Sequence, residues 1–175
     1  MTALLPFCDP YPGDRYPAIG KPWEVGGYAY ATDCRIVARV PLADAVEGRP
    51  ADRPPGTPNA QRLAIWDYFP LPEGDVLAAA CLPAAPEKCP CRDCDEADRS
   101  WCEACSGTGY AIPDEDPVVV GDWPFDPDYL RLFAHLPRLR SQVVHAKAGT
   151  YLLFQSGQLC GCVMPLLIVR EGKKS

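Results

Sequence analysis

Four cysteines between residues 91 and 105 form the part of the sequence best suited to chemistry. Cys91 and Cys94 make one Cys-x2-Cys pair, Cys102 and Cys105 make a second, and seven residues separate the two pairs. Zn²⁺ takes four thiolates in a tetrahedron at about 2.3 Å, and two intervening residues let a tight turn aim both thiolates of a pair at one point. The spacing predicts one structural zinc ion. A disulfide pair and unligated thiols are the alternatives.

Cys89 is an alternative ligand, because Cys89-Pro90-Cys91 places a third thiol before the loop. We favour Cys91, whose spacing to Cys94 is that of a standard pair. A four-cysteine zinc site has no open position for water or substrate, so it stabilises a segment that is too small for a core of its own. The metal is therefore expected to be structural and not catalytic.

The other nucleophilic and basic side chains are scattered along the chain. Cys160 and Cys162 fall on one face of an expected strand, where buried apolar roles suit them better than redox or metal roles. A thiol enzyme would need a base such as His145 beside a cysteine, and the sequence places nothing else around this histidine. We expect no enzyme activity, with a thiol or metal-dependent enzyme as the open alternative.

Composition and charge limit the remaining functions. The 175 residues are 47% hydrophobic, which is enough for one core. The formal net charge of −6 argues against attraction of the whole protein to nucleic acid, although a local basic face can still exist. No targeting peptide or membrane-length apolar run is evident. We expect a soluble, cytoplasmic protein with reduced cysteines and no membrane contact.

Turn signals divide the N-terminal part into short elements. Gly26-Gly27 and Thr32-Asp33 separate three expected strands over residues 23–40, which predicts a β-meander. A helix is expected to begin with Thr57 as N-cap and Pro58 at its first position. The residues of this helix that should face the core are Leu63, Trp66 and Phe69.

The C-terminal part has the clearest pattern. After a strand at Val118–Val120, Asp126 as N-cap and Pro127 at the first helical position predict a short helix that runs to about Leu136. Three strands should follow at residues 142–147, 151–155 and 159–168. The expected order of elements is β-α-β-β-β.

The expected helix has one apolar face, formed by Tyr129, Leu132, Phe133 and Leu136. We expect this face to pack against inward-facing residues of the last strands, among them Leu153 and Val163.

These elements predict an α+β fold in one domain. Residues 1–88 hold the N-terminal β-meander and proline-rich loops, residues 89–110 form a zinc-binding insertion, and residues 111–175 form the C-terminal β-α-β-β-β unit of the same domain.

Both halves of the chain resemble DNA sliding clamps. The clamp phrase in which a strand ends in Ala-Thr-Asp-Gly resembles Gly27-Tyr-Ala-Tyr-Ala-Thr-Asp-Cys-Arg-Ile-Val37 of this chain. The start of a clamp helix resembles Phe125-Asp-Pro-Asp-Tyr-Leu130. The final clamp strand resembles Leu159-Cys-Gly-Cys-Val-Met-Pro-Leu166. The resemblance implies a clamp-like fold of repeated β-α-β-β-β units. Cys34 stands where the phrase has glycine, so this turn must accommodate a Cβ. A bacterial clamp subunit has three such domains and this chain has material for about one, so a ring would need a homo-oligomer.

The clamp resemblance also implies partners. Helices line the DNA-facing side of sliding clamps, so phosphate contacts would fall to Arg131, His135, Arg138 and Arg140. The implied partner is duplex DNA or a DNA-processing protein. Alternatively, the clamp-like fold serves only as a protein-interaction scaffold or as an inhibitor of a host replication or defence protein.

The cysteine segment resembles half of the DnaJ-type cysteine-rich domain, whose repeat is C-x2-C-x-G-x-G. Only the second pair is complete here, since it continues to Gly107 and Gly109, so chaperone activity is not implied. Single clamp-like domains interrupted by cysteine pairs resemble small proteins of bacteriophages and mobile elements, which implies a viral or prophage source.

The first prediction concerns the metal. Elemental analysis should find one tightly bound zinc per chain, and the double variant Cys102→Ser/Cys105→Ser should lose it because half of the thiolate ligands are gone. The C-terminal unit should remain folded without zinc. Absence of zinc, or full occupancy in the double variant, would contradict the assignment.

Overall fold

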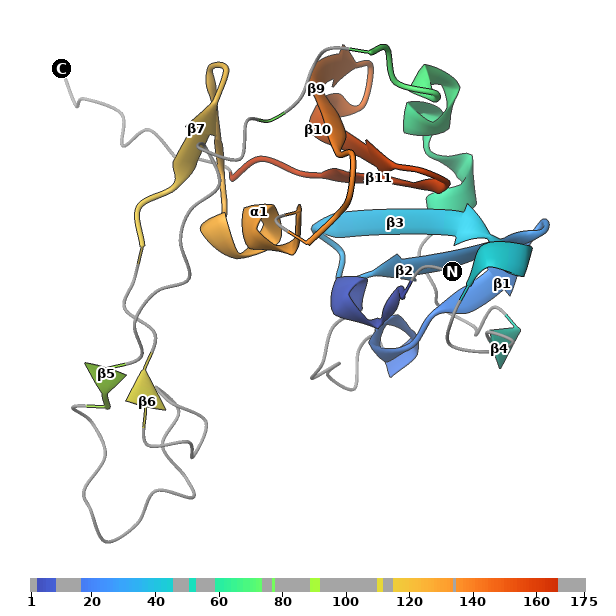
Figure 1. Ribbon diagram of the computed structural model, residues 1–175, viewed down its shortest axis with the longest axis horizontal. Coiled ribbons are helices and arrows are strands. Elements are labelled where there is room, and N and C mark those ends of the chain that lie inside the picture. Colours follow the sequence, from blue (N-terminus) through green and yellow to red (C-terminus); the bar gives the residue numbers. More distant parts are fainter. Residues whose placement is uncertain are drawn as a thin grey trace, which may run out of the picture.

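The computed structural model describes residues 3–8, 17–45, 51–52, 59–73, 77, 89–91, 110–111, 115–133 and 135–166. The chain is mostly β (Figure 1). The strands of the main sheet are β1 (Trp23–Val25), β2 (Tyr28–Thr32), β3 (Ile36–Pro41), β4 (Ala51–Asp52), β9 (Arg140–Ala146), β10 (Gly149–Ser156) and β11 (Leu159–Val163). Two separate strand pairs are β5 (Cys89–Pro90) with β6 (Tyr110–Ala111), and β7 (Val118–Val120) with β8 (Trp123–Phe125).

Within the described residues, helical structure is limited to short pieces. The α-helix α1 (Pro127–Phe133) has seven residues. The 3-10 turns are η1 (Leu5–Phe7), η2 (Pro17–Gly20), η3 (Leu42–Asp44), η4 (Ala60–Arg62) and η5 (Ala64–Tyr68). The expected α+β fold is therefore confirmed only in its coarse outline, a β-sheet with a helix on it, and within the described residues the balance is mostly β.

Two antiparallel meanders form the main sheet. Its order is β4-β1-β2-β3-β11-β10-β9, so β1-β2-β3 and β9-β10-β11 lie side by side and meet where β3 pairs with β11. The short β4 adds to β1 in parallel. Gly26 and Gly27 have φ values of 60° and 81°, the positive values that a two-residue type I′ hairpin turn needs. The N-terminal meander expected from the sequence is confirmed.

One face of the sheet packs against α1 and η1. Leu130 and Phe133 of α1 are fully buried there, and the Phe154 ring lies between Phe133 at 4.7 Å and Phe7 at 5.8 Å between ring centroids. Val163 belongs to the same core, as predicted. Burial of these large rings removes much apolar area from water, which makes this layer a main source of stability.

The opposite face packs against the segment that contains η4 and η5. Trp23, Tyr30 and Trp66 form its aromatic part, and Leu153 belongs to this second core. The prediction that Leu153 faces the helix is wrong, because successive residues of a strand point to opposite sides and Leu152 and Phe154 occupy the helix side.

The segment around Trp66 does not form the expected α-helix. Within the described residues it consists of η4 and η5, and Leu63 between them has extended backbone angles of φ −67° and ψ 129°, which interrupt any helix. Thr57 and Pro58 lie outside the described residues. The expected inward face is confirmed, since Trp66 is buried and Leu63 and Phe69 are partly buried against the same core.

The C-terminal unit differs from the prediction at its start. Val118–Val120 pairs with the unpredicted strand β8 in a separate ribbon, because Gly121 at φ 63° makes a tight turn before Trp123. Helix α1 begins as predicted, with the Asp128 N–H donating to Asp126 Oδ1 at 3.0 Å. It ends at Phe133 and not Leu136, since the residue before Pro137 is disfavoured in a helix.

The second prediction tests the helix-side core. Phe133→Ala should lower the free energy of unfolding by about 3–5 kcal/mol, because the ring is 1% exposed and its removal leaves a cavity against Phe154. Urea denaturation measures the change. Val119→Ala is the matched control, since Val119 is 66% exposed and should change stability by less than about 0.5 kcal/mol. Equal effects of the two substitutions would mean that α1 is docked differently.

Candidate functional site

The turn between β2 and β3 exposes the side chains of Cys34 and Arg35 to solvent. Asp33 Oδ1 accepts hydrogen bonds from the N–H groups of Arg35 and Ile36, both at 2.8 Å. Thr32 Oγ1 accepts from the Cys34 N–H at 3.0 Å. These bonds hold Cys34 at φ 78°, a left-handed conformation that is uncommon for a residue with a Cβ. The turn accommodates the Cβ, as the sequence requires.

Helix α1 is tied to this turn by a partly buried hydrogen bond. The Tyr129 hydroxyl donates to Asp33 Oδ2 at 2.5 Å. Burial of the phenol, followed by its hydrogen bond to the Asp33 carboxylate, raises the pKa of Tyr129 well above its ordinary value. The hydroxyl therefore remains a donor at physiological pH and fixes the turn relative to the helix.

Two neighbouring cavities open beside this turn. The first, of about 280 Å³, lies between the strands and the η4 segment, where Ile36, Leu63 and Cys162 line it. The second, of about 650 Å³, lies against Trp123 and the chain that follows β11. Both cavities are lined by Cys34, Arg35, Tyr151 and Met164, so they adjoin. We call this continuous surface the Met164 groove.

The Met164 groove has an apolar wall and, among the described residues that line it, a single cation at its edge, Arg35. Met164 is 48% exposed and Trp123 is 37% exposed, and together they line one apolar surface, the arrangement that marks interaction sites. The backbone holds the wall in place, because the Met164 N–H donates to the Arg35 carbonyl at 2.9 Å and the Leu166 N–H to the Pro124 carbonyl at 2.8 Å. The exposed Arg35 side chain makes no ion pair within the described part of the chain.

An arginine between aromatic rings fixes the segment behind the groove. The Arg39 guanidinium carbon lies 4.0 Å from the centroid of the Trp66 ring and 4.7 Å from that of the Tyr28 ring. Such cation–π contacts add to the packing of Trp66, whose Nε1–H also donates to the Ala60 carbonyl at 2.6 Å. Ala60 lines the Met164 groove, so Arg39 positions one wall of it.

Two buried thiols lie next to the groove. Cys160 and Cys162 are 8% and 2% exposed, in agreement with the buried roles expected from the sequence. Burial raises the pKa of the Cys162 thiol to about 12, and burial also raises the pKa of Cys160, although the Arg39 guanidinium opposes that change. Neither thiol is a thiolate at neutral pH, so neither is poised as a nucleophile.

His145 lies away from these thiols. Its Nδ1 is 3.0 Å from Thr150 Oγ1, and its ring lies 5.9 Å from that of Trp123, between centroids. Neither of these two partners of the imidazole is a cysteine. The arrangement provides no base for a thiol nucleophile at this histidine.

The cysteine segment is closed at its base by a strand pair. Cys89 pairs with Ala111 and Pro90 with Tyr110, and Figure 1 shows β5 and β6 apart from the main sheet. Cys91 follows β5 and is 9% exposed. Cys94, Cys102 and Cys105 lie outside the described residues, among which no group of three or more metal-binding side chains occurs. The pairing of β5 with β6 brings the two ends of the cysteine segment together, as an insertion requires. The zinc site itself remains a prediction.

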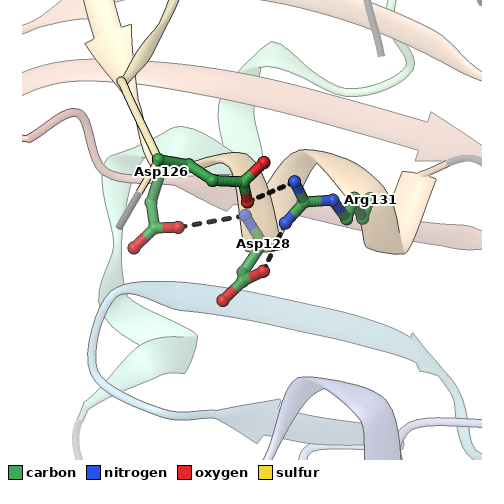
Figure 2. A network of polar contacts seen from close by, with 4 residues as sticks. Asp126, Asp128 and Arg131 are labelled. Atoms are coloured by element: carbon green, nitrogen blue, oxygen red, sulfur yellow. Dashed lines mark hydrogen bonds and ion pairs between the residues drawn. The ribbon is translucent and has the colours of Figure 1, made fainter. Parts of the chain in front are cut away.

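The four basic residues assigned to DNA do not share one free face. Figure 2 shows Arg131 turned back along α1 toward Asp128. One amino group of Arg131 donates to Asp128 Oδ1 at 2.6 Å, and the other is paired with Glu115. Arg140 is paired with Glu73 at 3.0 Å. His135 and Arg138 are exposed beyond the end of α1. Two of the three arginines are thus already held in ion pairs, and DNA contact remains a prediction.

Comparison with protein-family models, with curated proteins and with solved structures found no match for the chain. No helix in the described part of the chain is long and apolar enough to cross a bilayer. The class that fold and site define is therefore a mostly-β domain with an apolar groove at the junction of two meanders.

Sequence reasoning missed the groove. Leu63 was expected to face the core and Tyr151 to begin a strand, but neither expectation places them beside Met164, because that contact depends on the pairing of strands distant in sequence. Arg35 and Met164 were noted only as parts of phrases that resemble sliding clamps.

The third prediction tests the state of the thiols. Iodoacetamide at pH 8 should alkylate native Cys162 at least about 100-fold more slowly than the exposed Cys34, because a thiol of pKa about 12 has almost no thiolate at that pH. Peptide mass spectrometry measures both rates, and the difference should vanish in urea. Rapid native labelling of Cys160 or Cys162 would instead favour the enzyme alternative.

Proposed function

We propose that this chain is a non-catalytic accessory protein that binds an extended segment of a DNA-processing protein in the Met164 groove. The observation that carries the proposal is the continuous apolar groove with Met164 and Trp123 exposed in its wall. Solvent-exposed apolar grooves of this kind are typical of binding sites. The DNA-processing identity of the partner rests on the resemblance of the sequence to sliding clamps.

The groove favours a particular kind of segment. An aliphatic side chain suits the smaller cavity, because Ile36, Leu63 and Cys162 line it. A carboxylate in the same segment would pair with Arg35, which stands at the junction of both cavities without an ion-pair partner among the described residues. A short acidic and apolar segment satisfies both requirements.

The fold supports the clamp-like part of the proposal. Two three-strand meanders are joined edge to edge, with η1 and α1 on one face, as expected for repeated units. A single chain cannot encircle DNA, so a ring would be a homo-oligomer. In this account the zinc held by Cys91, Cys94, Cys102 and Cys105 stabilises the insertion, and the metal takes no part in binding at the groove.

Direct DNA binding is the weaker alternative. Since Arg131 and Arg140 are held in ion pairs, phosphate contacts would depend on His135 and Arg138. Two contacts would give weak, salt-sensitive binding in an acidic protein. Binding to a protein partner would use the Met164 groove, a larger continuous surface than the one that His135 and Arg138 offer to DNA.

The fourth prediction tests the groove directly. With a partner captured from the source cell and then purified, Met164→Glu and Arg35→Glu should each weaken binding at least about tenfold, because they place charge in the apolar wall or reverse the cation. Val119→Glu and Arg62→Glu are the controls, since both side chains are exposed and outside the groove. Isothermal titration calorimetry measures the affinities.

Two outcomes would contradict the proposal. The controls could weaken binding as much as the groove variants do, which would place the contact elsewhere. Alternatively, wild-type protein could bind duplex DNA at low salt with an affinity that Arg138→Glu abolishes and Met164→Glu leaves unchanged. The second result would favour the DNA alternative.

A further inference from the structure

A second groove lies on the other face of the sheet, beside α1. It has a volume of about 740 Å³ and runs between η1, the end of α1 and the turn that joins β10 to β11. Its apolar floor is formed by Phe7, Leu132, Leu136 and Leu159. We call it the α1 groove. It shares no lining residue with the Met164 groove.

The rim of the α1 groove is charged. Arg138 and His135 line it, and both side chains are exposed. Asp44 lines it as well, yet it makes no ion pair with either of them. Among the described residues Arg138 makes no ion pair, so its guanidinium lies available at the edge of an apolar surface.

Arg138 is held in an unusual backbone conformation. Its φ is 51°, in the left-handed region that a residue with a Cβ rarely adopts. The preceding carbonyl is fixed, because the Ser156 hydroxyl donates to the Pro137 carbonyl at 2.6 Å. Non-glycine residues in such conformations persist where the surroundings enforce them, and they cluster at ligand sites. Glycine would fit this backbone more easily.

We propose that the α1 groove binds a small amphipathic carboxylate, with its apolar body on the floor and its carboxylate paired with Arg138. The volume lies within the range of about 300–1,000 Å³ that is typical of small-molecule sites. Arginine matches a carboxylate with two parallel hydrogen bonds. Asp44 in the same groove disfavours a ligand with several negative charges, and the apolar floor disfavours a nucleic-acid phosphate.

This inference is independent of the function proposed for the Met164 groove. Decanoate is a suitable probe, with decanol as its uncharged counterpart and acetate as its counterpart without an apolar body. Titration of the ¹⁵N-labelled full chain should show decanoate shifting the amides of Leu136, Gln158 and Leu159, which line the α1 groove. Decanol should bind at least about tenfold more weakly, and acetate should cause no saturable shift.

A glycine at position 138 separates binding from folding. Arg138→Gly removes the cation and suits the left-handed backbone, so the urea midpoint should be unchanged or higher while decanoate binds at least about tenfold more weakly. Arg62→Gln is the control and should bind like wild type. Wild-type affinity in Arg138→Gly, equal binding of decanol and decanoate, or shifts confined to the Met164 groove would each overturn the proposal.

Discussion

The close approach of β3 and β11 at Gly161 is the contact on which the rest of the structure depends. A Cβ at this position would lie 2.1 Å from the Val37 carbonyl oxygen and 2.6 Å from the Phe154 ring, so only glycine fits. The missing side chain lets the Phe154 ring lie over β11 between Phe7 and Phe133. One glycine thus permits both the joining of the two meanders and the packing of α1 and η1.

The junction also shapes the binding surfaces on both faces of the sheet. Ile36 and Val37 of β3 and Cys162 of β11 line the Met164 groove, while Leu159 at the start of β11 lines the α1 groove. Tyr129 and Arg39 hold the flanking elements in place from opposite faces. Because strands carry these four lining residues, the parts of the grooves that they form are in place before a ligand binds, which lowers the entropy cost of binding.

Local rules predicted the elements that local chemistry determines. Gly26-Gly27 predicted the first hairpin turn, and Asp126 with Pro127 predicted the start of α1, since a turn and a helix cap need only their own residues. The pairing of β3 with β11 joins strands that are far apart in the sequence, so rules based on neighbouring residues do not predict it. In Cys160-Gly161-Cys162 the sequence analysis considered only the two thiols, although the glycine between them determines the packing. Leu153 was assigned to the wrong face of the sheet. Alternation along β10 tells which of its residues share a face, but it does not tell which of the two faces packs against α1.

The most direct test of the junction is the free energy of unfolding of Gly161→Ala, measured by urea denaturation. Alanine in a strand is ordinarily more favourable than glycine by about 0.5–1 kcal/mol, so propensity alone predicts a gain. The account predicts the opposite sign, a loss of at least about 1–3 kcal/mol, because the nearest atom is a backbone oxygen that cannot move aside cheaply. A variant as stable as wild type, or more stable, would contradict the close contact between the two meanders.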